Sequence, residues 1–154
     1  MSSPDEKKSL VRRYYEEVVN TGNVDRVPEF IAPDYVEVHD NIRYECGIEG
    51  AKAHIFGGRQ TYSELHLTVE RQIAEGDWVV TQLTARGVHT GIWMGIKPTG
   101  KPVEFSCVNV DKVINGRIVE HGGAANMLGP LLNIAAIKVG CVEQFVGNRG
   151  VDLM

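Results

Sequence analysis

The sequence lacks several features that would place it in whole classes of protein. No apolar run approaches the roughly 20 residues of a membrane-spanning helix, and Met1 to Pro4 leads into a charged segment without an apolar signal region. The net charge of −4 is small and spread along the chain, so it forms neither a nucleic-acid footprint nor a polybasic membrane patch. We therefore expect a cytoplasmic protein with no nucleic-acid or membrane partner.

Cysteine and metal-ligand patterns are also scarce. The three cysteines, Cys46, Cys107 and Cys141, are odd in number and widely spaced, which suits a reducing compartment and small core or pocket-lining roles. No group of His, Asp and Glu has metal-ligand spacing, and no glycine-rich phosphate loop follows a strand. The sequence therefore predicts neither a metal nor a cofactor.

Apolar residues recur at three- and four-residue spacing in the first part of the chain, which predicts amphipathic helices. The expected helices cover residues 5–19, 24–30 and 48 to about 61. Ser3 or Asp5 could cap the first helix, and Gly57-Gly58 could end the third early. Residues 35–39 alternate as a strand that breaks at Asp40-Asn41.

The rest of the chain is dominated by β-prone runs. Four expected strands cover residues 65–74, 78–89, 103–114 and 117–125. Tight turns are signalled at Glu75-Gly76-Asp77 and Asn115-Gly116, and residues 90–101 form a longer loop. Three helices followed by a curved antiparallel sheet predict an α+β fold.

We expect one domain over residues 1–140, large enough to bury a core. A terminal helix is expected within residues 128–139. Residues 141–154 are expected to form a tail that packs on a partner subunit or is loosely ordered.

The last strand ends in four small residues followed by Asn126. Alternate side chains of a strand share a face, so the even-numbered residues from Ile118 to Asn126 would point the same way. The small residues on this face leave space, and Asn126 places a hydrogen-bonding group at its end. This combination predicts a pocket wall. His121 has the opposite parity and is expected to face away, unless a bulge at Gly122-Gly123 re-aims it.

Short motifs follow one another in a recognisable order over about residues 8 to 135. They are Tyr14-Tyr15, Phe30-Ile31-Ala32-Pro33-Asp34-Tyr35, His39-Asp40, Gly47-Ile48-Glu49-Gly50, Ile73-Ala74-Glu75-Gly76-Asp77, Gly87-Val88-His89-Thr90-Gly91, Met94 to Lys101, Asn115 to His121, and Met127-Leu128-Gly129. In this order they resemble the SnoaL-like polyketide cyclases, or ester-cyclase-like proteins, of the cone-fold superfamily that includes nuclear transport factor 2. The resemblance implies a cone-shaped curved antiparallel β-sheet wrapped by three N-terminal helices around an internal pocket, and a homodimer.

The chain departs from this family at the end of the last strand. Family members typically continue Glu-His with Trp and Asp and carry a general acid/base Asp a few residues on. Here these positions hold Gly122, Gly123 and Asn126. Asn cannot exchange a proton near neutral pH, although it still donates and accepts hydrogen bonds. Loss of the Trp side chain is expected to enlarge the cavity.

Three residues are candidates for catalysis. His39 is the best remaining titratable group for a general base, and its structural alternative is a hydrogen-bonded His at a strand end. Glu120 could act as an acid or form a salt bridge within the sheet. Asn126 could stabilise an enolate or oxyanion, or could cap the terminal helix.

A second set of residues is expected to contact the substrate from the wall or mouth of the pocket. These candidates are Tyr14, Tyr35, Phe56, His89, Trp93, Met94, Phe105, Asn109 and Gly122. For Trp93 and Met94 the alternative is a dimer contact, for His89 a structural role, and for Asn109 a strand-edge position.

The leading hypothesis is an enzyme without a cofactor that cyclises, isomerises or dehydrates a small hydrophobic carbonyl compound by proton transfer. The substituted Asp position and the small Gly122 keep open a second hypothesis, a non-catalytic binding protein for a hydrophobic small molecule. A third is a dimer-forming structural partner that acts through the outer face of the sheet.

Overall fold

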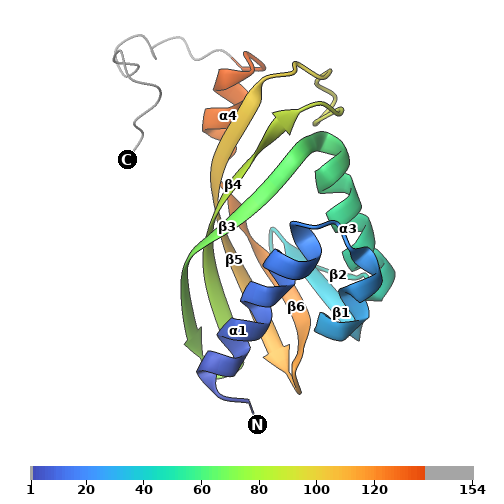
Figure 1. Cartoon of the computed structure of the whole chain (residues 1–154), viewed down its shortest axis with the longest axis vertical. Coiled ribbons are helices and arrows are strands. Elements are labelled where there is room, and N and C mark those ends of the chain that lie inside the picture. The colour runs from blue at the N-terminus through green and yellow to red at the C-terminus, as the bar shows by residue number, and fades with distance from the viewer. Residues whose placement is uncertain (1, 138–154) are drawn as a thin grey trace.

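In the computed structural model, which describes residues 2–137, helices cover one face of a curved, open sheet (Figure 1). The helical segments are α1 (Pro4–Tyr14), the π-helix η1 (Tyr15–Val19), the 3-10 helix η2 (Val24–Arg26), α2 (Val27–Phe30), α3 (Gly47–Thr61) and α4 (Leu128–Asn133). The strands are β1 (Ile31–His39), β2 (Ile42–Glu45), β3 (Tyr62–Glu75), β4 (Trp78–His89), β5 (Pro102–Ile114) and β6 (Arg117–Ala125).

The sheet has the strand order β2-β1-β6-β5-β4-β3. Neighbouring strands are antiparallel except β1 and β6, which run parallel. The predicted α+β fold with a curved antiparallel sheet is confirmed, with the β1–β6 pair as its one parallel pairing. The parallel pairing brings the end of β1 beside the middle of β6, with Glu37 opposite His121, and these two segments carry the site.

The predicted helices and the four long strands are all present within one or a few residues of their expected bounds. Ser3 caps α1 in a capping box with Glu6, so of the two proposed caps Ser3 is the one used. Gly57-Gly58 does not end α3, which continues to Thr61. Strand β2 was not predicted. All four of its residues are exposed, so no buried face produces a recognisable sequence pattern. The predicted tail, residues 141–154, lies outside the described residues.

The hydrophobic core lies between the helices and the concave face of the sheet. On β4 and β5 the odd-numbered residues, such as Val79, Leu83 and Val113, are buried, whereas even-numbered neighbours are more exposed. Helix α1 and η1 add Val11 and Val18 to the same core. The alternation fixes which strand residues face inward, because a one-residue slip would turn the apolar set outward.

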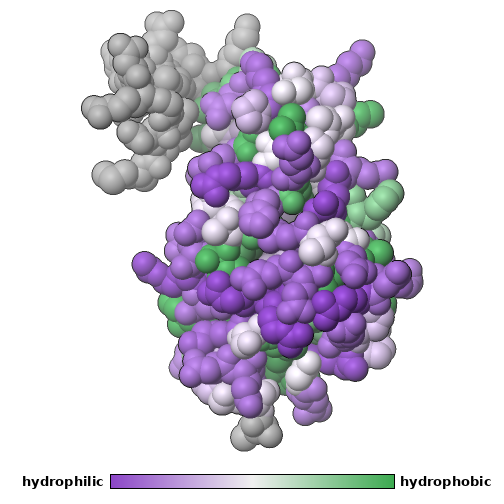
Figure 2. Space-filling model, in the orientation of Figure 1, coloured by the Kyte–Doolittle hydropathy of each residue, from purple (hydrophilic) through white to green (hydrophobic). Residues whose placement is uncertain are grey.

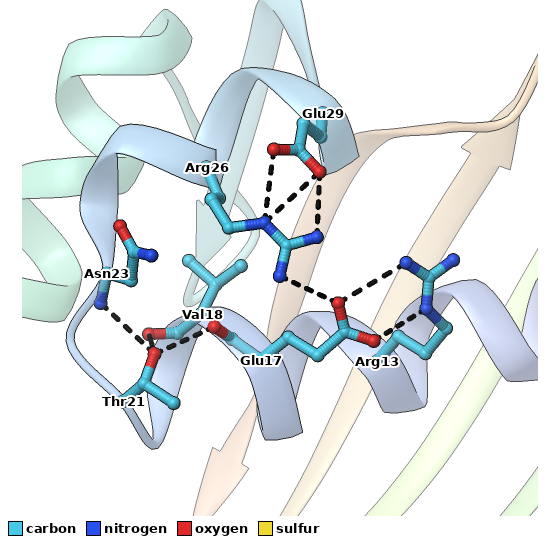
Figure 3. Close-up of polar contacts among 7 residues, drawn as sticks. All are labelled: Arg13, Glu17, Val18, Thr21, Asn23, Arg26 and Glu29. Carbon is cyan, nitrogen blue, oxygen red and sulfur yellow. Dashed lines mark hydrogen bonds and ion pairs between the residues drawn. The ribbon is translucent and has the colours of Figure 1, made fainter.

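A chain of ion pairs ties the first helical layer together (Figure 3). Glu17 in η1 pairs with Arg13 at 2.7 Å and with Arg26 at 2.8 Å, and Arg26 also pairs with Glu29. Both guanidinium groups lie over the ring of Phe30. These partly exposed pairs contribute little stability individually, but together they fix η1 against η2 and α2. This matters because η1 begins with a tyrosine of the site.

The face shown in Figure 2 is mostly hydrophilic, with apolar residues in small patches. Within residues 2–137 no helix combines the length and the apolar character needed to cross a membrane.

Candidate active site

A cavity of about 360 Å³ opens between α1, η1, α3 and the concave face of the sheet. Most of its wall is apolar, with Leu65, Leu67, Leu83 and Ile55 among the lining residues. The carboxylates and imidazoles gather at one end, where β1, α3, β5 and β6 meet. Such a pocket, apolar with a few converging polar groups, is the usual form of a small-molecule site.

The first polar cluster is centred on Glu37 in β1, and Glu37 is only 8% exposed. Its carboxylate contacts His54 Nδ1 at 2.8 Å, His39 Nε2 at 3.1 Å and the Tyr35 hydroxyl, which donates a hydrogen bond at 3.2 Å. Burial alone would raise the pKa of Glu37, but the hydrogen bond and charge of His54, aided by His39 and His121, lower this pKa to about 2. Glu37 is therefore a buried, ionised carboxylate between two imidazoles.

The second cluster is centred on Asp111 in β5, a residue only 1% exposed. His121 Nδ1 lies 2.7 Å from Asp111 Oδ1, and the Tyr15 hydroxyl donates to Oδ2 at 3.4 Å. The Asn109 side-chain amide in turn donates to the Tyr15 oxygen at 2.9 Å. Burial lowers the pKa of His121, but the Asp111 charge and hydrogen bond outweigh it, so this pKa is raised above 6.5.

The two clusters face each other across the end of the cavity. The ring of His121 lies edge-on to that of His54 with centroids 5.9 Å apart, and His39 follows at 6.4 Å from His54. Because an ionised carboxylate only accepts hydrogen bonds, Asp111 fixes the proton of His121 on Nδ1 and leaves Nε2 for proton exchange. The arrangement provides imidazoles that can take up a proton beside one that can donate it.

Two adjacent tyrosines reach the cavity from the junction between α1 and the π-helix η1. A π-turn inserts one residue into the helical ladder, and such segments often occur at functional sites. Here Tyr14 ends α1 and Tyr15 begins η1, and both are buried and line the cavity. Burial is the main reason that the pKa of each phenol is raised, which keeps both hydroxyls protonated.

Several residues predicted to contact the substrate do line the cavity. They are Tyr14, Tyr35, Phe105, Asn109 and Gly122, together with the proposed base His39. Their roles in binding or catalysis stay predictions. A Cβ on Gly122 would lie 2.9 Å from the carbonyl oxygen of Val38 in β1, so a side chain here would have to displace that strand. Gly122 therefore has two effects. It leaves space in the cavity, as predicted, and it allows β1 and β6 to approach each other closely.

Other predicted site residues lie elsewhere. Phe56 is 60% exposed on the outer side of α3, and Met94 is exposed in the loop after β4. His89 is fully buried but does not line the cavity, and Trp93 packs on the far side of Tyr62. Asn126 is exposed, and the N-cap of α4 is Met127 without a side-chain cap, so the predicted helix cap at Asn126 is not formed.

The structure reverses the predicted orientations of Glu120 and His121. Val113 pairs with Ile118 but Lys112 pairs with Glu120, so Val119 is an extra residue in β6. This bulge turns His121 into the cavity and sends Glu120 to Arg43 of β2, 2.6 Å away. The bulge was expected at Gly122-Gly123, three residues later than its position in the structure, so the predicted parity of Glu120 and His121 is wrong.

Gly123 is required where β6 passes Asn109. Its φ is +152°, and a Cβ would collide with the carbonyl oxygen of Val108 and lie 2.8 Å from Asn109 Oδ1. We expect Gly123→Ala to lower the free energy of unfolding by about 1–3 kcal/mol, measured by urea denaturation. Gly57→Ala is the control, because Gly57 lies inside α3 with open space around it and should gain up to about 1 kcal/mol. Equal stability of both variants would contradict the close approach.

Besides Tyr15, four residues of the clusters were not predicted as site residues, although the sequence contained a signal for three of these four. Glu37 lies between Tyr35 and His39 with the same strand parity, and Asp111 shares parity with Asn109. His54 lies one turn after Ala51 in α3 and lines the cavity, although its side chain is 52% exposed. For His121 alone, a correct prediction of the side-chain orientation required knowledge of the bulge at Val119. In the described part of the chain, no three His, Cys, Asp or Glu side chains are arranged to hold a metal ion.

Comparison with known proteins agrees with this architecture. The family model described as SnoaL-like polyketide cyclase matches residues 9–134. The nogalonic acid methyl ester cyclase of Streptomyces nogalater is 34% identical over 117 residues, covering 73% of this chain and 85% of the relative. The aklanonic acid methyl ester cyclase of Streptomyces peucetius is 30% identical over 126 residues, covering 78% of this chain and 84% of the relative.

Solved structures show the same fold. A crystal structure from a Jannaschia species, described as that of a SnoaL-like polyketide cyclase, superposes with a TM-score of 0.77. It is 26% identical in sequence, and the match covers 90% of this chain and 99% of the other. The comparison therefore extends over nearly the whole length of both proteins.

Proposed function

Because this chain belongs to the SnoaL-like polyketide cyclase family, we propose that it closes a ring in a small hydrophobic carbonyl compound by an intramolecular aldol reaction. The observation that carries the proposal is the group of three imidazoles held by two buried carboxylates at one end of an otherwise apolar cavity. Such groups can move protons at neutral pH without a cofactor.

In the first step, an imidazole held by Glu37 removes a proton from a carbon next to a carbonyl group. His54 is the nearer of the two imidazoles to His121, and its Nε2 is free of Glu37 because Nδ1 makes that contact. The negative charge of Glu37 stabilises the imidazolium that forms. His39, the base predicted from the sequence, contacts the same carboxylate through Nε2 and serves as the second imidazole of the pair.

In the second step, the enolate carbon attacks another carbonyl carbon of the same molecule and forms the new carbon–carbon bond. The oxygen of the attacked carbonyl gains negative charge and takes a proton from His121, whose raised pKa favours the protonated form. Return of the first proton to His121 restores the site. The product is an isomer of the substrate, because no atom is lost or gained.

The test is direct incubation with nogalonic acid methyl ester and aklanonic acid methyl ester, the compounds named in the two relatives. We expect a product of unchanged mass and altered retention in liquid chromatography with mass spectrometry. A product lighter by one water would indicate dehydration instead. Binding of either compound without any conversion would reject the cyclase proposal in favour of a non-catalytic binding protein.

We also propose that two copies of the chain pair through the outer face of the sheet. Ile73 on β3, Val80 on β4 and Val110 on β5 are aligned by the strand register on this face, and Val108 beside them is 46% exposed. Helices α1 and α3 lie on the other face (Figure 1). Sedimentation equilibrium at micromolar concentration should give the dimer mass, and Val108→Lys should shift it to the monomer. A monomeric wild-type protein would contradict the proposal.

A further inference from the structure

One buried hydroxyl in the cavity wall takes part in neither proton-transfer cluster. Tyr62 begins β3, is only 6% exposed and lines the cavity, yet its hydroxyl has no hydrogen-bond partner among residues 2–137. Burial is the main cause that raises the pKa of this phenol to about 12, so the hydroxyl remains a donor. A buried polar group without a partner is costly and calls for an explanation.

Tyr62 lies far from the acid/base end of the cavity. Its ring packs against Phe105 and Trp93, with centroids 5.9 Å and 5.6 Å away. Phe105 and Asn109 are four residues apart on β5, which is about 13 Å of extended chain. The register places Tyr62 opposite His89, whose Nε2 is also unpaired within the described residues. Of these two atoms only the Tyr62 hydroxyl belongs to a residue of the cavity wall, so it is the unsatisfied polar group at this end of the cavity.

The wall between the two ends is apolar. Leu65, Leu83 and Cys107 line it, and burial raises the pKa of the Cys107 thiol to about 11, so no charged group interrupts it. A ligand that satisfied both ends would need an apolar body with an oxygen at each extremity. Phe would fill the space beside Phe105 and Trp93 equally well, so packing alone does not account for a tyrosine here.

We propose that the Tyr62 hydroxyl donates a hydrogen bond to an acceptor oxygen at the far end of the substrate. The substrate class is then an elongated, mainly apolar molecule with one carbonyl at the reacting end and a second oxygen about 10 Å or more away. This inference rests on the proposed function, because the reacting end is defined by the Glu37 and Asp111 clusters. Tyr62 is a positioning residue, not a proton-transfer group.

The experiment compares two probes of nearly equal shape, 2,6-diacetylnaphthalene and 2-acetyl-6-ethylnaphthalene. The first has an oxygen at both ends, and the second has one oxygen only. Dissociation constants are measured by titration with the wild type, with Tyr62→Phe and with Tyr44→Phe. Tyr44 is an exposed tyrosine on β2 and provides the matched control. Binding requires no turnover, so failure of the cyclase proposal would not alter this readout.

We expect the wild type and Tyr44→Phe to bind the diacetyl probe about tenfold more tightly than the acetyl-ethyl probe. Tyr62→Phe should bind both probes equally and should melt at the same temperature as the wild type or higher, because the hydroxyl has no protein partner to lose. A preference that persists in Tyr62→Phe would overturn the proposal. So would a lower melting temperature of Tyr62→Phe, or a wild-type protein that binds both probes equally or neither.

Discussion

Replacing Glu37 by Gln is expected to lower kcat on nogalonic acid methyl ester by about 10²–10⁴-fold, the usual contribution of acid–base catalysis. The substitution keeps the shape of the side chain but removes the charge that both His39 and His54 contact. An imidazole that takes up the substrate proton would then lack its counter-ion. The amide also donates hydrogen bonds, so it would change which nitrogen of one imidazole bears the proton.

The control is Glu45→Gln, which makes the same chemical change at an exposed position on the neighbouring strand β2. Its kcat should equal that of the wild type. KM should change little in Glu37→Gln, because the apolar wall that contains most of the cavity surface is untouched. A Glu37→Gln enzyme with wild-type kcat would show that Glu37 has only a structural role and would remove the base from the proposed mechanism.

The pH dependence of stability gives an independent check on Glu37. Its pKa falls from 4.5 to about 2 on folding, so the ionised form stabilises the native state above pH 4.5. This contribution, at most about 3 kcal/mol, is lost as the pH falls from 4.5 through 2. Urea denaturation across this range should show a steeper loss of stability in the wild type than in Glu37→Gln. Parallel curves would contradict the lowered pKa.

Asp111→Asn is the second large expected effect, on both activity and stability. Asp111 is buried and contacts His121 and Tyr15 at once, so the variant leaves a buried imidazole without its negative partner. Removal of one member of a buried pair typically costs roughly 3–5 kcal/mol, and we expect the lower end because Asn retains some hydrogen bonds. We expect kcat to fall by at least about 10²-fold, because His121 loses the charge that keeps it protonated and the orientation that presents Nε2.

The sign of the pH dependence separates this mechanism from a general loss of fold. In the wild type the pKa of His121 is raised above 6.5 by Asp111, so the pair stabilises the protein below pH 6.5 and loses this contribution as the pH rises through the raised pKa. Without Asp111, burial lowers the pKa of His121 and only the weaker effect of the Glu37 charge opposes it, so this pKa should fall. The variant should therefore lose stability as the pH falls through 6.5, the reverse of the wild type.

Nuclear magnetic resonance titration of the imidazole protons should show the same reversal for His121. Asp34→Asn, an equal change of charge at an exposed position of β1, is the matched control and should leave activity and the His121 titration unchanged. If His121 titrates at the same pH in Asp111→Asn and in the wild type, the dyad does not set its protonation and the proposed proton donor is wrong.

Much of this protein was determined by its sequence alone. The helical spacing of Val11, Tyr14 and Val18, the turn at Asn115-Gly116 and the β-prone run of residues 103–114 are local patterns, because each depends on residues close together in the chain. They predicted the α+β fold correctly, and the order of motifs identified the family. Tyr35, His39, Phe105 and Asn109 were among the residues expected at the pocket, and the structure places all four in its wall.

The tertiary structure alone decided which groups meet in the site. The parallel pairing of β1 with β6 brings Glu37 beside His121, although 84 positions separate them along the chain. The extra residue Val119 turns His121 inward and Glu120 outward, and a bulge depends on the register with β5 rather than on the residues of β6. Strand parity is a local property that one inserted residue inverts, whereas the pairing of distant strands is fixed only when the whole sheet forms.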